Sequence, residues 1–587
     1  MKKLALLFAV LALGVALGAF PARSQEPSAE PDGEIHVETV EVEVINIDVY
    51  VTGKDGEPIR GLTKDDFVLS VDRRGVPISN FYAVTSEANA AAPQPEPRRD
   101  LQVEEDRPVG VPDFVPPTSP ATPPDQQLHV VVYIDNFNLT PFNRNRVMRE
   151  LRHFLYEELG PDDQVMLASF DRSLHLRYPF TSDPREINEA LLELEEISAQ
   201  RIHRNRERQD FIALLNDADF GHKQDTGEVG YYEGVALNQL RMYAESERND
   251  IHFTLDALAR VVENLAGSPG RKALVYVSDG IPMIAGEDLF YLVKQRYENS
   301  MSLLTMSEFD FSRRLQELAA KANANRVTFY TIDARGLTVG TQGTVDQATA
   351  GEPGQQAFVD SVWTTNLQAP LQLLADETGG RAIINANRIG PDLLRMGTDF
   401  KNYYSLGYAP LTPGGGRYHR IEVKLRKGLK GMRVRHRSGY RDKTIEQRMI
   451  DGTLSALNLN LQANSLGARV FVGQPKRRSD GNFDTPIFLE VPFDRLTLIE
   501  QDGNYFGELR LWLVAKDEKD HSTEPQQIPV DIRIPTDRIG ETEGKNYTYG
   551  IELTMESGYH DLAVGVRDEL GGDYAFLRQG VEVRAGT

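Results

Sequence analysis

Four long apolar runs, each followed by an aspartate, constrain this chain more than any other feature of its sequence. They cover residues 130–134, 165–170, 273–277 and 327–332. Continuous apolar runs of this length are typical of parallel strands that are buried on both faces. Helical patterns with apolar residues three and four apart lie between them. The sequence therefore predicts an α/β domain with a doubly wound, mainly parallel sheet.

Segments with a strand pattern flank this domain, which we place at 128–399. Residues 35–85 and 400–441 alternate apolar and polar side chains. Each segment is too small to bury a core alone, so we predict that the two pair in one β-sandwich. Residues 450–587 repeat the alternation at the spacing of a C-terminal β-sandwich. The segment 86–127 is rich in proline and is interpreted as a linker.

A mostly helical stretch, 186–265, interrupts the α/β pattern. It is too long for a single crossover between strands, so we interpret it as an inserted helical arm that projects from the domain. Between its apolar groups lies a run of basic residues, namely Arg201, Arg204, Arg206 and Arg208.

The N-terminus has the pattern of a secretory signal peptide. Lys2 and Lys3 precede an apolar stretch over 4–20, and Ala22-Arg23-Ser24 is a small-x-small cleavage site. We therefore predict a signal peptide at 1–24 and a protein that is exported, either periplasmic or secreted to the outside of the cell. An uncleaved anchor helix is the alternative. No later stretch approaches the roughly 20 apolar residues of a spanning helix, so no transmembrane segment is expected after cleavage.

Charge and composition exclude several classes of function. The chain has 65 Lys and Arg against 87 Asp and Glu, a formal net charge of −22. A surface this acidic repels phosphate backbones, which argues against nucleic-acid binding. The absence of cysteine excludes disulfides, thiolate metal sites and a cysteine nucleophile.

Candidate functional residues follow the predicted strands. Asp135, Asp171 and Asp333 come directly after three of the apolar runs, and Asp279 follows the run at 273–277 after Ser278. In an open parallel sheet these positions share the edge at which the strands end, here called the carboxyl edge, where ligands bind. Four carboxylates at one edge suit a hard cation such as Mg²⁺. Alternatively, each aspartate caps the helix or turn that follows it.

Several pieces of the sequence together resemble a known family. The segments VVVYIDN, GPDDQVMLASFD, SPGRKALVYVSDG, VTFYTIDARG and LADETGGRAII occur in this order. They resemble a von Willebrand factor A domain, and with their flanks they look like the bacterial secreted variant often labelled acidobacterial-type. The resemblance covers roughly residues 40–441. It implies a Rossmann-like α/β fold and a role in adhesion or assembly.

The resemblance also implies a metal site with a recognisable donor set. The family uses Asp-x-Ser-x-Ser after the first strand, a Thr from a middle loop and an Asp after the fourth strand. Asp135 and Asp279 match the two aspartates. Asn138 and Thr140 offer oxygens one residue out of step, and Thr254 is the candidate for the middle Thr. A Mg²⁺ ion held by these residues would depend largely on water ligands.

The two serine positions of that motif hold Phe137 and Leu139, which cannot ligate a metal. Apolar side chains there suggest that the carboxyl edge contacts a partner protein directly, together with Asp171 and Asp333. The resulting prediction is a degenerate metal site and a partner-binding surface at the same edge.

These observations favour a non-enzymatic, exported binding module for adhesion or assembly, whose partner is an extracytoplasmic protein. Two alternatives remain. One is a metal-assisted hydrolase at the aspartate edge, although the chain contains no His-Glu-x-x-His, Gly-x-Ser-x-Gly or Gly-x-Gly-x-x-Gly motif. The other is a structural envelope-assembly factor in which the β-sandwiches bind.

Overall fold

The computed structural model describes nine stretches of the chain, and all statements below concern these residues. They are 44–85, 127–199, 201–216, 229–297, 301–337, 353–410, 414–426, 431–461 and 463–584. The predicted signal peptide and nearly all of the predicted linker lie outside them.

A six-stranded sheet forms the centre of the α/β domain. Its strand order is β10-β9-β8-β5-β6-β7, and all neighbours are parallel except β6 and β7. The strands are β5 (Leu128–Ile134), β6 (Gln164–Phe170), β7 (Leu174–Thr181), β8 (Arg271–Ser278), β9 (Val327–Asp333) and β10 (Ala382–Ile383). Every residue of β5 and β8 is buried, as the continuous apolar runs predicted.

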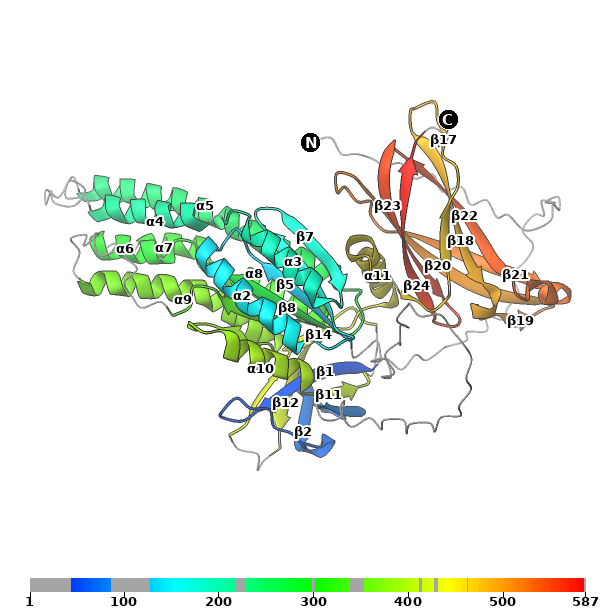
Figure 1. The fold of residues 1–587 in the computed structure, drawn as a ribbon, viewed down its shortest axis with the longest axis horizontal. Helices are drawn as coiled ribbons and strands as arrows, with labels where there is room; N and C mark the ends of the chain where they lie inside the picture. Colours follow the sequence, from blue (N-terminus) through cyan, green and yellow to red (C-terminus); the bar gives the residue numbers. More distant parts are fainter. Residues whose placement is uncertain are drawn as a thin grey trace, which may run out of the picture.

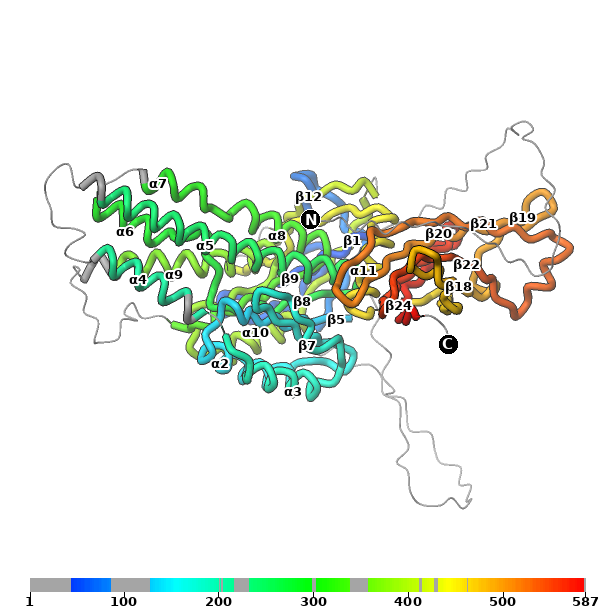
Figure 2. Tube along the Cα trace, turned by 90° about the horizontal axis from the view of Figure 1, so that it is seen from above, coloured from blue at the N-terminus to red at the C-terminus, as the bar shows by residue number. Residues whose placement is uncertain are grey.

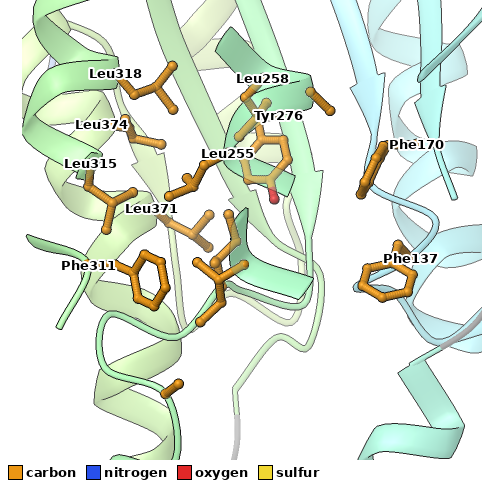
Figure 3. Packing of buried hydrophobic residues seen from close by; sticks show 14 of the residues in the cluster. Phe137, Phe170, Leu255, Leu258, Tyr276, Phe311, Leu315, Leu318, Leu371 and Leu374 are labelled. Carbon is orange, nitrogen blue, oxygen red and sulfur yellow. The ribbon is translucent and has the colours of Figure 1, made fainter. Parts of the chain in front are cut away.

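Helices cover both faces of this sheet. One face packs against α2 (Pro141–Glu158), α3 (Pro184–Glu195) and α10 (Gly390–Lys401). The other packs against α4 (Arg201–Asn216), α5 (Val229–Asn264), α6 (Glu287–Tyr297), α8 (Ser312–Ala324) and α9 (Pro353–Thr378). Figure 3 shows part of this second core, with Leu315, Leu318, Leu371 and Leu374 clustered together. With the β domains described below, this confirms the predicted doubly wound α/β fold and its β-sandwich flanks.

The helical projection differs in extent from the arm predicted at 186–265. Figures 1 and 2 show α4 and α5 extending away from the sheet beside α6, α9 and the short α7 (Met301–Met306). In contrast, α3 lies within the α/β domain, and the last part of α5 packs in its core through Leu258, Val261 and Val262. The projection is therefore built from helices that are distant in sequence. Several of the connections between strands of the sheet are longer than a crossover requires, and their helices extend into the projection.

The segments before and after the α/β domain form one β-sandwich. One sheet has the order β13-β1-β11-β4 and the other β14-β12-β2-β3. The strands are β1 (Ile45–Thr52), β2 (Phe67–Val71), β3 (Arg74–Val76), β4 (Asn80–Val84), β11 (Tyr403–Tyr408), β12 (Tyr418–Leu425), β13 (Arg433–His436) and β14 (Gly439–Arg441). Arg271 of β8 fastens this sandwich to the α/β domain. Its guanidinium pairs with Asp48 at 3.2 Å, donates to the Tyr50 hydroxyl at 3.0 Å and stacks over Tyr403.

The C-terminal unit is a second β-sandwich, preceded by α11 (Ile445–Leu459). One sheet holds β15 (Ala463–Asn464), β19 (Ile499–Gln501), β20 (Asn504–Asp517), β21 (Gln526–Pro535), β23 (Gly558–Asp568) and β24 (Tyr574–Val583). The other holds β16 (Arg469–Val472), β17 (Lys476–Arg477), β18 (Phe483–Pro492) and β22 (Asn546–Met555).

Helix α11 joins this sandwich to the α/β domain. The Ser455 hydroxyl accepts a hydrogen bond from Gly267 N at 3.0 Å and donates one to Asn264 O at 2.6 Å. A Cβ on Gly267 would lie 2.4 Å from the Cα of Gly452, so only glycine permits this approach.

This contact gives the first prediction. Gly267→Ala forces α11 away from the α/β domain, and overpacking of this kind typically costs about 1–3 kcal/mol. We expect a lowered or split unfolding transition in scanning calorimetry of the full chain. Gly75→Ala is the matched control, because a Cβ there meets nothing within 4 Å. Equal transitions for the two variants would contradict this account of the joint.

A second prediction concerns His129 on β5, which lies opposite Lys272 of β8. Burial, and secondarily the charge of Lys272, lower the pKa of His129 from 6.5 to about 4. Between pH 6.5 and about pH 4, His129 is therefore protonated in the unfolded chain but not in the folded chain. The free energy of unfolding is highest above pH 6.5 and decreases as the pH falls through this range. The expected loss between about pH 7.5 and about pH 4.5 is about 3 kcal/mol. Urea unfolding of wild type and His129→Gln at both pH values measures it, and an equal pH dependence in both proteins would refute it.

Candidate functional site

The aspartates that follow β5 and β8 meet at the carboxyl edge, as predicted from the parallel strands. Asp135 N donates to Val277 O of β8 at 3.0 Å, and Asp279 N donates to Asn138 O at 3.1 Å. The loop after β5 therefore crosses the end of β8 and brings the two carboxylates to one place. Both residues are buried, with 0% and 1% of their surface exposed.

Protein donors surround the Asp135 carboxylate. Its Oδ1 accepts the backbone N–H of Asn138 at 3.1 Å. Its Oδ2 accepts the side-chain amide of Asn138 at 2.9 Å, the Ser278 hydroxyl at 3.1 Å and the Tyr276 hydroxyl. Burial nevertheless raises the pKa of Asp135, because these donors only partly offset the loss of water.

Asp279 is engaged in a similar way. Its Oδ2 accepts Thr140 N at 3.0 Å, and its Oδ1 accepts the Asn143 amide at 2.9 Å. Burial raises its pKa, and the nearby positive charge of Arg201 opposes that shift. Arg201 is itself buried and donates to Asn138 O at 3.2 Å and Gly280 O at 2.8 Å.

The other members of the predicted metal set also lie here. Thr254 is fully buried on α5, and its hydroxyl accepts the Asn138 amide at 3.2 Å while donating to Asp250 O at 3.0 Å. Thr140 contributes its backbone N–H to Asp279. Asn138 and Thr254 thus act as hydrogen-bonding partners within the site.

The expected exposed apolar surface at Phe137 and Leu139 is wrong. Leu139 has 0% of its surface exposed and packs in the core beneath α2. Phe137 is 6% exposed, lies beside Phe170 (Figure 3), and is covered by the guanidinium groups of Arg172 and Arg204 at 5.3 and 5.1 Å. The loop after β5 thus turns both side chains inward.

The other two aspartates of the edge carry basic partners. Asp333 is buried and forms a bidentate pair with Arg335, with hydrogen bonds of 2.9 and 2.8 Å. Asp171 is partly exposed and pairs with His175 at 2.7 Å. As positioned, both stabilise their own loops, so neither forms a free acidic surface for a partner.

Sequence reasoning missed two residues at this edge. Arg201 begins α4, and the basic run to which it belongs gave no sign of facing inward. Phe142 occupies the first turn of α2 and is 79% exposed. It directly follows Thr140-Pro141, so a large apolar residue in the open first turn of a helix was the available signal.

The donor set fits a divalent cation poorly. Each carboxylate oxygen of Asp135 and Asp279 already accepts a protein hydrogen bond, and the positive charge of Arg201 lies near Asp279. Among the described residues, no group of three or more His, Asp or Glu side chains could hold a metal. Phe137 and Leu139 stand at the two serine positions of the motif and have no oxygen to offer a metal.

No protein-family model matches the chain, and no curated protein matches it. Solved structures similar to it include an aerotolerance-related membrane protein from Bacteroides fragilis, at 14% identity over 46% of this chain and 98% of that one, with a TM-score of 0.24. A second is the conserved hypothetical protein BatB from Bacteroides thetaiotaomicron, at 14% identity over 47% of this chain and 96% of that one, with a TM-score of 0.21. A third is manganese-loaded TRAP protein from Plasmodium vivax, at 11% identity over 54% of this chain and 94% of that one, with a TM-score of 0.22.

These TM-scores lie below 0.5, so the fold assignment does not depend on them. It depends on the strand order of the central sheet and on Asp135 and Asp279. These two aspartates follow the first and fourth strands of the sheet in chain order, where the resemblance placed them. The α/β domain has a von Willebrand factor A-like fold. In the described part of this chain, no helix combines the length and apolar character needed to cross a bilayer.

The geometry of the A-like domain gives a third prediction. Millimolar Mg²⁺ or Mn²⁺ should leave the melting temperature unchanged, because the carboxylates are already bonded and Arg201 repels a cation. A cation present at about 100 times its Kd would instead add about 2.7 kcal/mol of stability. Differential scanning fluorimetry with each ion and with EDTA measures this. A rise that EDTA reverses, and that Asp279→Asn abolishes, would show that the site does bind metal.

Proposed function

We propose that the chain is an exported, non-enzymatic protein-binding module whose A-like domain recognises an extracytoplasmic protein without a metal ion. One observation carries this proposal. The carboxylates of the family's metal site are closed off by protein donors, while Phe142 lies exposed on the same edge. The edge is thus better suited to direct side-chain contact than to contact through a bound ion.

The contact surface that we propose centres on Phe142 and Leu337. Leu337 follows β9 and is 52% exposed. Arg146, one helical turn after Phe142, donates to Ala334 O at 2.6 Å, which holds the start of α2 against the loop that leads to Leu337. Large apolar side chains on a fixed backbone are typical anchors of protein interfaces.

The helical projection offers a second area for contact. Met242 of α5 is 73% exposed, Leu304 of α7 64% and Phe358 of α9 51%. Single exposed apolar residues are common, so these residues support the proposal less strongly than the carboxyl edge does.

The two alternatives have weaker support. A hydrolase at the aspartate edge needs a carboxylate that is free to bind a cation or to accept a proton from water. Asp135 and Asp279 are buried and bonded to protein donors, which argues against either role. An assembly factor that binds through its β-sandwiches predicts instead that changes at the carboxyl edge leave binding intact.

Export rests on the sequence pattern of residues 1–24, which lie outside the described residues. The small-x-small site before Gln25 supports cleavage there, and the proposal places the mature chain in the periplasm or outside the cell.

The fourth prediction tests the binding surface. Phe142→Ser should weaken capture of the partner from envelope extract by about tenfold or more, as truncation of an interface anchor does. EDTA should have no effect on capture by the wild type. Phe471→Ser is the matched control, because Phe471 is 45% exposed on β16 of the C-terminal sandwich.

Quantitative pull-down with the three full-length proteins, tagged identically, gives the comparison. Loss of binding in Phe471→Ser but not in Phe142→Ser would favour the assembly-factor alternative. Loss with EDTA, restored by Mg²⁺, would refute recognition without metal.

A further inference from the structure

A cavity of about 330 Å³ lies where the A-like domain, the first β-sandwich and the C-terminal unit meet. We call it the junction cavity. Its walls come from the loop 266–270 before β8, from the start of β1, from β14 and α11, and from β24. Figure 1 shows α11 between the A-like domain and the C-terminal sandwich.

The junction cavity is strongly basic in an acidic protein. Seven of its lining residues are Lys or Arg, whereas the only carboxylate among them is Asp451. That carboxylate already pairs with Lys443 at 2.5 Å. Arg567 also pairs with Glu569 at 3.8 Å, outside the wall, so the wall itself carries more positive than negative charge.

Two buried hydrogen-bond donors in the wall, the Arg437 Nε and the Ser268 hydroxyl, have no partner among the described residues, which is uncommon for buried polar groups. Lys272 is 5% exposed, and its ammonium donates to Ser268 O at 2.7 Å. Arg437 is 9% exposed; its two terminal nitrogens donate to Asn323 O and Asn46 O, but its Nε has no partner within the described chain. The Ser268 hydroxyl is likewise buried without a partner among the described residues.

The electrostatics agree with this geometry. Burial lowers the pKa of Lys272 well below its usual value, and the charges of Arg326 and Lys443 lower it further. Burial lowers the pKa of Arg437 to about 10, and Arg326 adds to the effect. An anion in the cavity would relieve the repulsion among these groups.

We infer that the junction cavity binds a small, soluble anion of the phosphate class. Arginine forks and a hydroxyl donor suit the several oxygens of a phosphate group better than they suit the two of a carboxylate. The volume lies at the lower end of the range for small-molecule pockets. Because three parts of the chain form the walls, the bound anion bridges them.

Titration calorimetry of the full-length protein with inorganic phosphate and with pyrophosphate, at constant ionic strength set with chloride, tests the inference. Saturable binding of at least one is expected. Arg326→Gln should weaken it by about tenfold, as the loss of a charge-assisted hydrogen bond does. Arg469→Gln, an exposed arginine on β16 outside the cavity, should leave the affinity unchanged.

Ser268→Ala separates binding from folding. Because the hydroxyl has no partner in the described structure, its removal should not lower the melting temperature, yet it should weaken anion binding several-fold. Absence of saturable binding of either anion, or equal weakening in Arg326→Gln and Arg469→Gln, would overturn the inference.

A lipid headgroup carries the same chemistry as a free phosphate. Co-sedimentation with vesicles of phosphatidylglycerol and phosphatidylcholine forms the last arm of the experiment. One outcome would overturn the assignment to a soluble ligand. In it, neither soluble anion binds, and the wild type binds these vesicles while Arg326→Gln does not.

Discussion

The buried guanidinium of Arg201 is the interaction on which the carboxyl edge depends. It donates to Asn138 O after β5 and to Gly280 O after β8, and its charge lies near Asp279. It therefore connects the first helix of the projection to the ends of two central strands. Arg208, two turns further along α4, pairs with buried Asp288 at 2.7 Å and continues the attachment. Helix α4 of the projection thus also supplies hydrogen bonds and positive charge at the site.

This attachment also explains the inward turn of Phe137 and Leu139. Leu139 fills the core beneath α2, and Phe137 packs on Phe170 under two guanidinium groups. A loop held by apolar burial and by a built-in positive charge has one favoured arrangement. A loop held by an ion has two arrangements, one with the ion bound and one without it. The recognition that we propose at this edge would therefore be constitutive, because no ligand is needed to set its conformation.

The sequence was sufficient to predict what depends on strand periodicity. Parallel strands with continuous apolar runs placed Asp135 and Asp279 together, since both follow central strands at one edge. The direction of single side chains was not predictable in this way, because Phe137 can satisfy its environment by facing a partner or the core. The basic run of α4 was partly predictable: Arg201, Arg204 and Arg208 are three and four residues apart and share one helix face. Their role was missed because a charged face normally faces solvent.

Strand β8 relates the carboxyl edge to the junction cavity. Lys272 lies near its start and lines the cavity, and Asp279 directly follows its end. Seven residues of extended strand separate these positions by roughly 23 Å. The strand is buried throughout and paired on both sides, so a shift along its axis would break the register with β5 and β9. An anion in the cavity would therefore act on how the three parts of the chain are held together, and the geometry around Asp279 would stay as it is.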